Sequence, residues 1–110
     1  MNIEQLREFC LSLPNTTEDV KWGNDLCFCI GKKMFAVTGV DSISSGISFK
    51  CTPEKFAELT EVEGIRPAAY VARYHWVSVE DLGALSSTEL KELIRNSYQL
   101  VRDKLPAKLR

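Results

Sequence analysis

The hydrophobic positions of this chain change period along its length, and the change predicts its secondary structure. Near the N-terminus apolar residues recur every three or four positions, which predicts a helix from Asn2 to Leu13. Asn2 can cap this helix together with Gln5, and Pro14 and Asn15 stop it. Its expected buried stripe consists of Ile3, Leu6, Cys10 and Leu13.

From Thr17 to Phe49 the pattern shortens to apolar runs separated by Gly-marked turns, which is typical of β-strands. Gly31-Lys32 suits a two-residue hairpin turn, so the strands on either side are expected to be antiparallel neighbours. Four strands are predicted, at 19–22, 26–30, 34–38 and 46–50. A fifth, at 74–79, places Tyr74, Trp76 and Ser78 on one side and His75, Val77 and Val79 on the other.

Two further helices are indicated by their capping residues. Thr52-Pro53-Glu54 opens a short helix that ends before Gly64. Residues 65–73 have the composition of a structured loop. Ser86 and Glu89 form a capping box for the last helix, which Pro106 ends. Its expected core stripe consists of Leu90, Leu93, Ile94, Ser97, Leu100, Val101 and Leu105.

The resulting order, α-β-β-β-β-α-β-α, predicts an α+β fold in two layers, an antiparallel β-sheet with its helices on one face. A chain of 110 residues, 45% of them hydrophobic, is sufficient for one core, so residues 1–110 are expected to form a single domain. The start of the chain has neither a basic flank nor an apolar signal segment. We therefore expect a cytoplasmic protein, without a membrane partner.

Candidate chemistry is sparse. The four cysteines, Cys10, Cys27, Cys29 and Cys51, lack a secretory context and are expected to be reduced and packed as small hydrophobes. Cys27-x-Cys29 is a weak match to zinc-ligand spacing, so no metal or cofactor is expected. With one histidine, a nucleophilic pair would require His75 beside Cys27, Cys29 or Cys51. No catalytic motif is present, and we expect a protein that is not an enzyme.

The net charge of −1 gives no global attraction for nucleic acid, but the basic residues are concentrated near the C-terminus. In the last helix Lys91, Arg95, Tyr98 and Arg102 follow i, i+4, i+7, i+11 spacing, which places them on one face. Such a stripe could lie along a phosphate backbone, with Lys104, Lys108 and Arg110 beyond it. The alternative is a solvated helix face whose cations complement the helix dipole.

A second group combines aromatic and basic side chains on strands or their turns. Trp22 and Trp76 could stack on bases, although indoles that anchor a core, with their N–H groups bonded to a carbonyl, are the commoner case. The members of this second patch are Lys21, Trp22, Lys50, Arg73, His75 and Trp76.

Six segments in order resemble the bacterial MmcQ/YjbR family: residues 20–26, 31–36, 48–51, 64–68, 72–77 and 97–101. They include Val20-Lys21-Trp22-Gly23-Asn24-Asp25-Leu26 and Ala72-Arg73-Tyr74-His75-Trp76-Val77. The resemblance covers nearly the whole chain. It implies a small cytoplasmic bacterial protein with a CyaY-like, secretion-chaperone-like α+β fold. Family members are often labelled DNA-binding because of that fold, which by itself does not fix function.

Three functions follow as hypotheses. The first is a monomeric, non-enzymatic DNA-binding module that uses both basic groups. The second is a protein-interaction adaptor that receives a peptide on the open sheet face or the 65–74 loop. The third is a small-ligand binder or Cys/His enzyme, which requires His75, a cysteine and Trp76 to converge in one pocket. The DNA contacts of the first hypothesis are Lys91, Arg95, Arg102, Lys104, Lys108, Arg110, Lys21, Trp22, Lys50, Arg73, His75 and Trp76.

Overall fold

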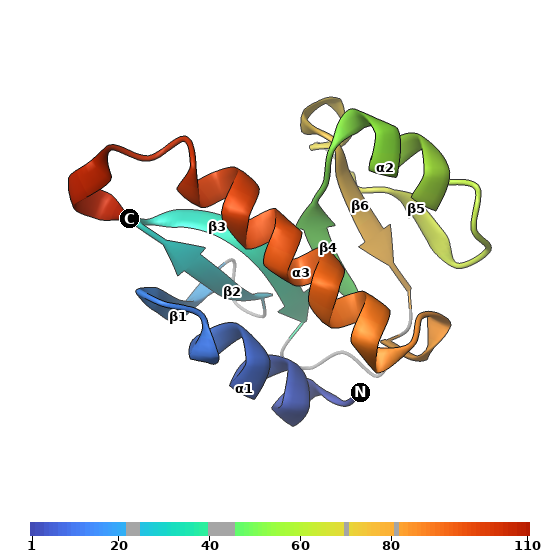
Figure 1. Cartoon of the computed structure of the whole chain (residues 1–110). Helices are drawn as coiled ribbons and strands as arrows, with labels where there is room; N and C mark the ends of the chain where they lie inside the picture. The colour runs from blue at the N-terminus through green and yellow to red at the C-terminus, as the bar shows by residue number, and fades with distance from the viewer. Residues whose placement is uncertain (22–24, 40–45, 70, 81) are drawn as a thin grey trace.

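The computed structural model describes residues 1–21, 25–39, 46–69, 71–80 and 82–110. Within them the predicted α+β fold is confirmed, and each predicted α-helix is present (Figure 1). The elements are α1 (Ile3–Ser12), β1 (Thr16–Lys21), β2 (Asp25–Ile30), β3 (Lys33–Gly39), β4 (Ile47–Lys50), α2 (Pro53–Leu59), β5 (Ile65–Pro67), η1 (Ala72–Tyr74), β6 (Trp76–Val79), η2 (Leu82–Ala84), α3 (Ser87–Arg102) and η3 (Ala107–Leu109), where η marks a 3-10 helix.

The described strands form one antiparallel sheet in the order β1-β2-β3-β4-β6-β5. Figure 1 shows the three α-helices on one face of this sheet. There α1 packs against β1, α3 crosses β3 and β4, and α2 lies over β5 and β6. We call this the helix side of the sheet and the opposite face the open side.

Capping places the helix starts where the sequence predicts them. Asn2 accepts the Gln5 N–H at 2.8 Å, and the Gln5 side chain accepts the Asn2 N–H at 3.0 Å. Thr52 caps α2, and Ser86 caps α3 through the Glu89 N–H. These side chains satisfy N–H groups that the first helical turn leaves unpaired.

The hairpin between β2 and β3 confirms the predicted turn. Gly31 and Lys32 have φ angles of 55° and 69°, as a two-residue turn of this type requires. Gly31 has a second reason to lack a side chain, because a Cβ there would lie 2.8 Å from Cδ1 of Leu105. The segment after α3 therefore packs onto this hairpin.

Two expectations for the region between α2 and α3 are wrong. Residues 65–67, predicted within a loop, form the short edge strand β5, which pairs with β6. Tyr74 and His75, predicted to start the next strand, lie instead in η1 and in a left-handed turn, with φ 64° at His75. The strand itself begins at Trp76.

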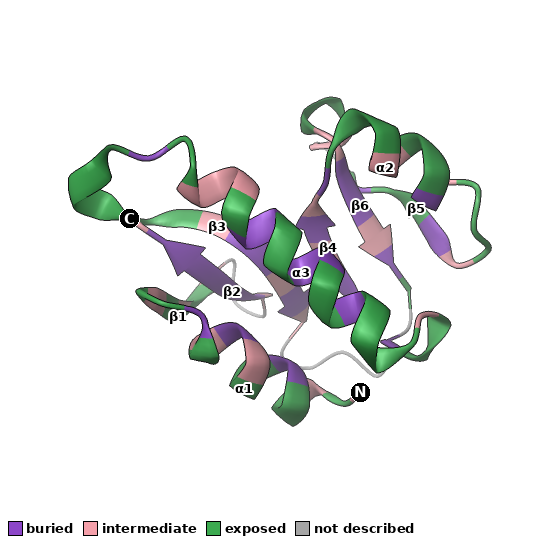
Figure 2. Cartoon of the chain, viewed as in Figure 1, coloured by how far each residue is buried: buried purple, intermediate pink, exposed green. Residues whose placement is uncertain are grey.

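The core fills the space between the sheet and the helices (Figure 2). Phe28, Phe35 and Phe49 are fully buried there, together with Leu6 of α1 and Ile94 of α3. A hydroxyl also lies in this core. Ser97 donates to the Phe35 carbonyl at 2.6 Å and accepts the Lys50 N–H at 3.0 Å, which ties α3 to β3 and β4.

All four cysteines are buried and none forms a disulfide. Cys10 and Cys51 belong to the core, whereas Cys27 and Cys29 alternate with core residues of β2 and therefore face the open side. Burial raises the pKa of the Cys27 and Cys51 thiols to about 11. No helix in the described residues has the length and apolarity needed to cross a lipid bilayer.

Candidate functional site

An exposed aromatic ring lies close to two cations where β4 and η1 meet. Tyr74 is 49% exposed, and the Arg73 guanidinium carbon lies 4.9 Å from the centroid of its ring. Lys50 Nζ donates to the Tyr74 carbonyl at 3.0 Å and lies 5.9 Å from the same centroid. The left-handed turn at His75 fixes this arrangement, since the His75 N–H bonds to Ala72 and its carbonyl accepts the Cys51 N–H.

A third cation, Lys104, follows α3 and its capping residue Asp103. Partial burial, and to a lesser extent the nearby Lys104 ammonium, lower the pKa of Lys50. Lys104 is exposed, as is Arg73. We call Lys50, Arg73, Tyr74 and Lys104 the basic corner. It combines one exposed ring with three positive charges from three separate elements, a composition that suits phosphates and stacked bases.

Beside the basic corner the open side of the sheet is hollowed. Strand register pairs Lys50 directly with Trp76, so the two side chains are neighbours on this face. Trp76 is only 9% exposed and lines a cavity of about 710 Å³. Described residues lining this sheet-face cavity are Asp25, Met34, Val37, Ser48, Arg66, Ala68, Ala69, Val71, Trp76 and Ser78.

The lining of the sheet-face cavity is apolar with a few polar groups. The Ser48 and Ser78 hydroxyls lie 3.3 Å apart on adjacent strands. Arg66 is at the edge, where it pairs with Glu80 at 2.8 Å. The segment after β5 is held in place by the Ala68 N–H, which bonds to the Trp76 carbonyl at 3.0 Å. Cavities of roughly 300–1,000 Å³ with apolar walls and few polar groups are typical of ligand sites.

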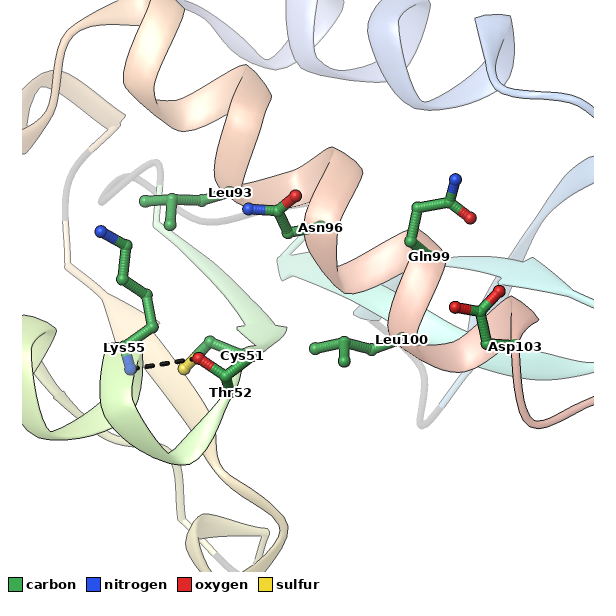
Figure 3. Close-up of a pocket in the computed structure, with 8 residues that line it drawn as sticks. All are labelled: Cys51, Thr52, Lys55, Leu93, Asn96, Gln99, Leu100 and Asp103. Carbon is green, nitrogen blue, oxygen red and sulfur yellow. Dashed lines mark hydrogen bonds between the residues drawn. The ribbon is translucent and has the colours of Figure 1, made fainter.

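A different depression lies on the helix side, between α2 and α3. Figure 3 shows Leu93 and Leu100 of α3 pointing toward the segment that carries Cys51, Thr52 and Lys55. The part of the depression shown there has a volume of about 310 Å³. An adjoining part, also of about 310 Å³, shares Lys55, Leu93 and Asn96 with it. We call the two together the interhelical groove. Its acidic residues are Glu58, Glu89, Glu92 and Asp103, against the single cation Lys55 in the described lining, so it does not suit phosphate.

The predicted basic stripe of α3 is divided in the structure. Lys91 and Arg95 lie over the Phe9 ring of α1, at 5.8 and 5.4 Å from its centroid. Arg102 is half-buried, with Nη1 3.8 Å from Asp103. The expectation that Tyr98 lines this face as an accessible ring is wrong. It is 4% exposed, packs edge-on against Phe35, and donates to the Pro14 carbonyl at 2.6 Å.

The cations after α3 have different local surroundings. Lys108 lies in the short helix η3, which ends at Arg110. Arg110 is used locally, since its Nε donates to the Leu105 carbonyl at 3.0 Å and its own carbonyl accepts from Asn15. Among these residues Lys104 is the one that comes near Lys50.

The second predicted patch is also separated. Lys21 ends β1 at the far side of the sheet from β6, and Trp22 lies outside the described residues. Trp76 is buried in the sheet-face cavity, so it is not the accessible stacking surface that was expected. Lys50 and Arg73 are brought together at the basic corner. The His75 ring instead packs edge-on against Phe56 of α2.

The convergence needed for a Cys/His site does not occur among the described residues. Trp76 lines the sheet-face cavity, whereas Cys51 lines the interhelical groove. The Cys51 thiol lies 3.2 Å from the carbonyl oxygen of His75, to which it donates, and the His75 ring contacts Phe56. A thiol with its pKa raised to about 11 is protonated at neutral pH and is a poor nucleophile.

Sequence reasoning missed the exposure of Tyr74, the proximity of Lys104 to Lys50, and the cavity. Two serines, Ser48 and Ser78, could have indicated the cavity from the sequence. Ser48 and Ser78 alternate with Phe49, Val77 and Val79 on their strands, so small polar side chains face the open side on both. A pair of small residues on adjacent strands leaves room above them.

Comparison with known proteins agrees with this fold over most of the chain. The family model described as YjbR matches residues 11–100. The "Uncharacterized protein YjbR" of Escherichia coli K12 is 27% identical over 115 residues, which cover 100% of this chain and 95% of that protein. The crystal structure of Deinococcus radiodurans DR2400, with family-model domain DUF419, has a TM-score of 0.87 and 30% identity, covering 99% of this chain and 85% of the other. A Pseudomonas syringae protein has a TM-score of 0.76 and 26% identity in its crystal structure, covering 93% of this chain and 100% of the other. The chain belongs to the YjbR family.

Proposed function

We propose that this protein binds DNA without catalysing a reaction, and that the basic corner is its contact surface. The observation that carries this proposal is the exposed Tyr74 ring, with the Lys50 ammonium 5.9 Å and the Arg73 guanidinium carbon 4.9 Å from its centroid. Exposed rings flanked by cations suit a nucleic-acid strand, because bases stack on the ring and phosphates pair with the charges.

The charge of the whole molecule supports a local contact surface rather than a general one. A net charge of −1 provides no overall attraction, so binding depends on a few phosphates. Each neutralised phosphate contributes about 0.7 to 0.9 to the slope of log affinity against log salt. With three cations, the basic corner predicts a slope of roughly −2 to −3 and weak binding at physiological salt.

Fluorescence anisotropy with a labelled oligonucleotide across a salt series tests this function. Lys104→Gln and Arg73→Gln are each expected to weaken binding and reduce the slope by about 0.7 to 0.9. Lys55→Gln is the matched control, since it removes one partly exposed lysine from the acidic interhelical groove. No binding at low salt, or affinity that does not change with salt, would reject the function.

A protein-interaction adaptor is the second candidate. The low exposure of Trp76 favours it, because a buried indole beside apolar walls suits the side chain of a peptide. If no oligonucleotide binds, titration with a library of short apolar peptides decides the matter. Changes in the NMR signals of Val37 and Trp76 would support the adaptor, and their absence would reject it.

A further inference from the structure

The sheet-face cavity and the basic corner are parts of one surface. Trp76 and Lys50 are paired across β4 and β6, so the indole in the cavity lies next to a lysine of the basic corner. The Lys50 ammonium is directed toward Tyr74 through its hydrogen bond to the Tyr74 carbonyl. A chain of phosphates held by the cations would therefore pass the entrance of an aromatic cavity.

We infer that the sheet-face cavity receives one unstacked base of a single-stranded DNA whose phosphates lie on the basic corner. This inference rests on the DNA binding proposed above and specifies the form of DNA that is bound. Nothing in the proposed phosphate contacts alone distinguishes a single strand from a duplex. The cavity makes the distinction, because a paired base would first have to leave its stack.

The lining of the cavity suits a flat polar molecule. Trp76 is only 9% exposed, so it contributes a small aromatic part of the wall rather than a free stacking surface. The Ser48 hydroxyl donates to Ser78 at 3.3 Å, which leaves the Ser78 hydroxyl to donate to a base edge and the Ser48 oxygen to accept from one. Met34, Val37 and Val71 provide apolar walls. The volume, about 710 Å³, accommodates a base with part of its sugar.

The position of the cavity favours a base over an added peptide strand. Peptides that extend a sheet pair with the backbone of an edge strand. Most of the cavity instead lies over β3, β4 and β6, which are interior strands whose backbones already pair on both sides, and within the edge strand β5 only Arg66 lines it. A single inserted group is therefore the suitable occupant, and the adjacent cations Lys50, Arg73 and Lys104 select one attached to phosphates.

The decisive probe is a short strand of abasic residues that carries one central thymine, compared with the same strand fully abasic. Both have the same phosphates, so their difference in anisotropy reports the base alone. We expect the thymine strand to bind about 5-fold more tightly, the low end of the range for base–aromatic contacts, because little of Trp76 is exposed. A matched duplex should bind more weakly than an ordinary single strand of the same sequence.

Variants of two cavity residues test whether the preference for the thymine strand arises in the cavity. Ser48→Leu and Ser78→Leu fill the cavity without changing charge, and each should abolish the thymine preference while leaving binding of the abasic strand unchanged. Thr17→Leu, an exposed residue on the open side of β1 outside the cavity lining, is the matched control. If either leucine variant does not fold, the wild-type protein gives a second measurement. The NMR signal of its Trp76 indole N–H should shift when the thymine strand is added but not when the abasic strand is added.

The outcomes distinguish base insertion from the DNA binding on which it depends. Equal affinity for thymine and abasic strands, or tighter binding of the duplex, overturns base insertion while DNA binding stands. Loss of the thymine preference in Thr17→Leu also overturns it, since the base would then contact another part of the sheet. If no strand binds at low salt, DNA binding and base insertion fail together.

Discussion

The two sides of the sheet use the same strands for different purposes. On the helix side Phe28, Phe35 and Phe49 are fully buried beneath α1 and α3. On the open side the residues that alternate with them are smaller or polar, among them Ser48 and Ser78, and they border a cavity of about 710 Å³. Packing explains the residues of the helix side. It does not account for small polar residues beside a buried indole, and for this reason the proposed binding surface is placed on the open side.

Replacing Phe49 by alanine provides the largest test of this difference. Phe49 is fully buried on the helix side, and loss of such a ring costs about 3–5 kcal/mol of unfolding free energy. Ser48→Ala, one residue away on the open side, should cost about 1 kcal/mol or less, because it removes one hydroxyl contact of 3.3 Å. Urea denaturation measures both. Similar losses would mean that both sides of β4 contribute equally to the core.

Protein stability at alkaline pH tests whether water is excluded from the open side of the sheet outside the cavity. Burial raises the pKa of Cys51, on the helix side, and of Cys27, on the open side, from 9.0 to about 11. Because the folded protein holds each proton more tightly than the unfolded chain, this stability is complete below pH 9 and is lost as the pH rises through about 11. Each thiol should account for a loss of about 1–3 kcal/mol.

Urea denaturation at a series of pH values, with Cys51→Ala and Cys27→Ala, measures these losses. Each variant should be less stable than wild type at neutral pH and should lose less stability on going to alkaline pH. An unchanged pH dependence in Cys27→Ala alone would mean that water reaches β2 from the open side, and that the cavity is wider than its described lining.

Ser97 connects the two sides and gives the next largest effect. Its hydroxyl lies on the helix side but accepts the backbone N–H of Lys50, whose side chain belongs to the basic corner. Ser97→Ala should cost about 1–3 kcal/mol in urea denaturation, since a buried N–H loses its acceptor. Asn96→Ala, at the exposed neighbouring position, should change stability by about 0.5 kcal/mol or less. A neutral Ser97→Ala would show that Lys50 is held in place without it.

The sequence predicts the helix side better than the open side, and the reason is the range of the interactions. Caps at Asn2, Thr52 and Ser86 and the turn at Gly31 are local, so they are readable from neighbouring residues. The strand at Ile65–Pro67 is short, contains proline and depends on β6 for its pairing, so it was not predictable from its own pattern.

The candidate site was only partly predictable. The sequence identifies Lys50, Arg73 and Lys104 as cations but not as neighbours, because they belong to β4, to η1 and to the segment after α3. Tyr98 fits two patterns at once. It follows Lys91 by seven residues, but it also follows Leu90 and Ile94 at helical spacing, and the structure places it with them in the core.

Neutralising the two cations of α3 that lie over Phe9 gives the smallest expected effect and separates the two predicted DNA surfaces. Lys91 and Arg95 contact the Phe9 ring on the helix side, whereas the basic corner adjoins the open side. Lys91→Gln with Arg95→Gln should reduce stability by about 1 kcal/mol or less, as exposed cation–aromatic contacts do. In DNA anisotropy the pair should leave the salt slope unchanged, whereas Arg73→Gln with Lys104→Gln, with the same change in charge, should reduce it by roughly 1.4 to 1.8. A larger reduction from the α3 pair would place the DNA on the helix side, where α3 itself would then be the contact surface and the small polar residues of the open side would need another explanation.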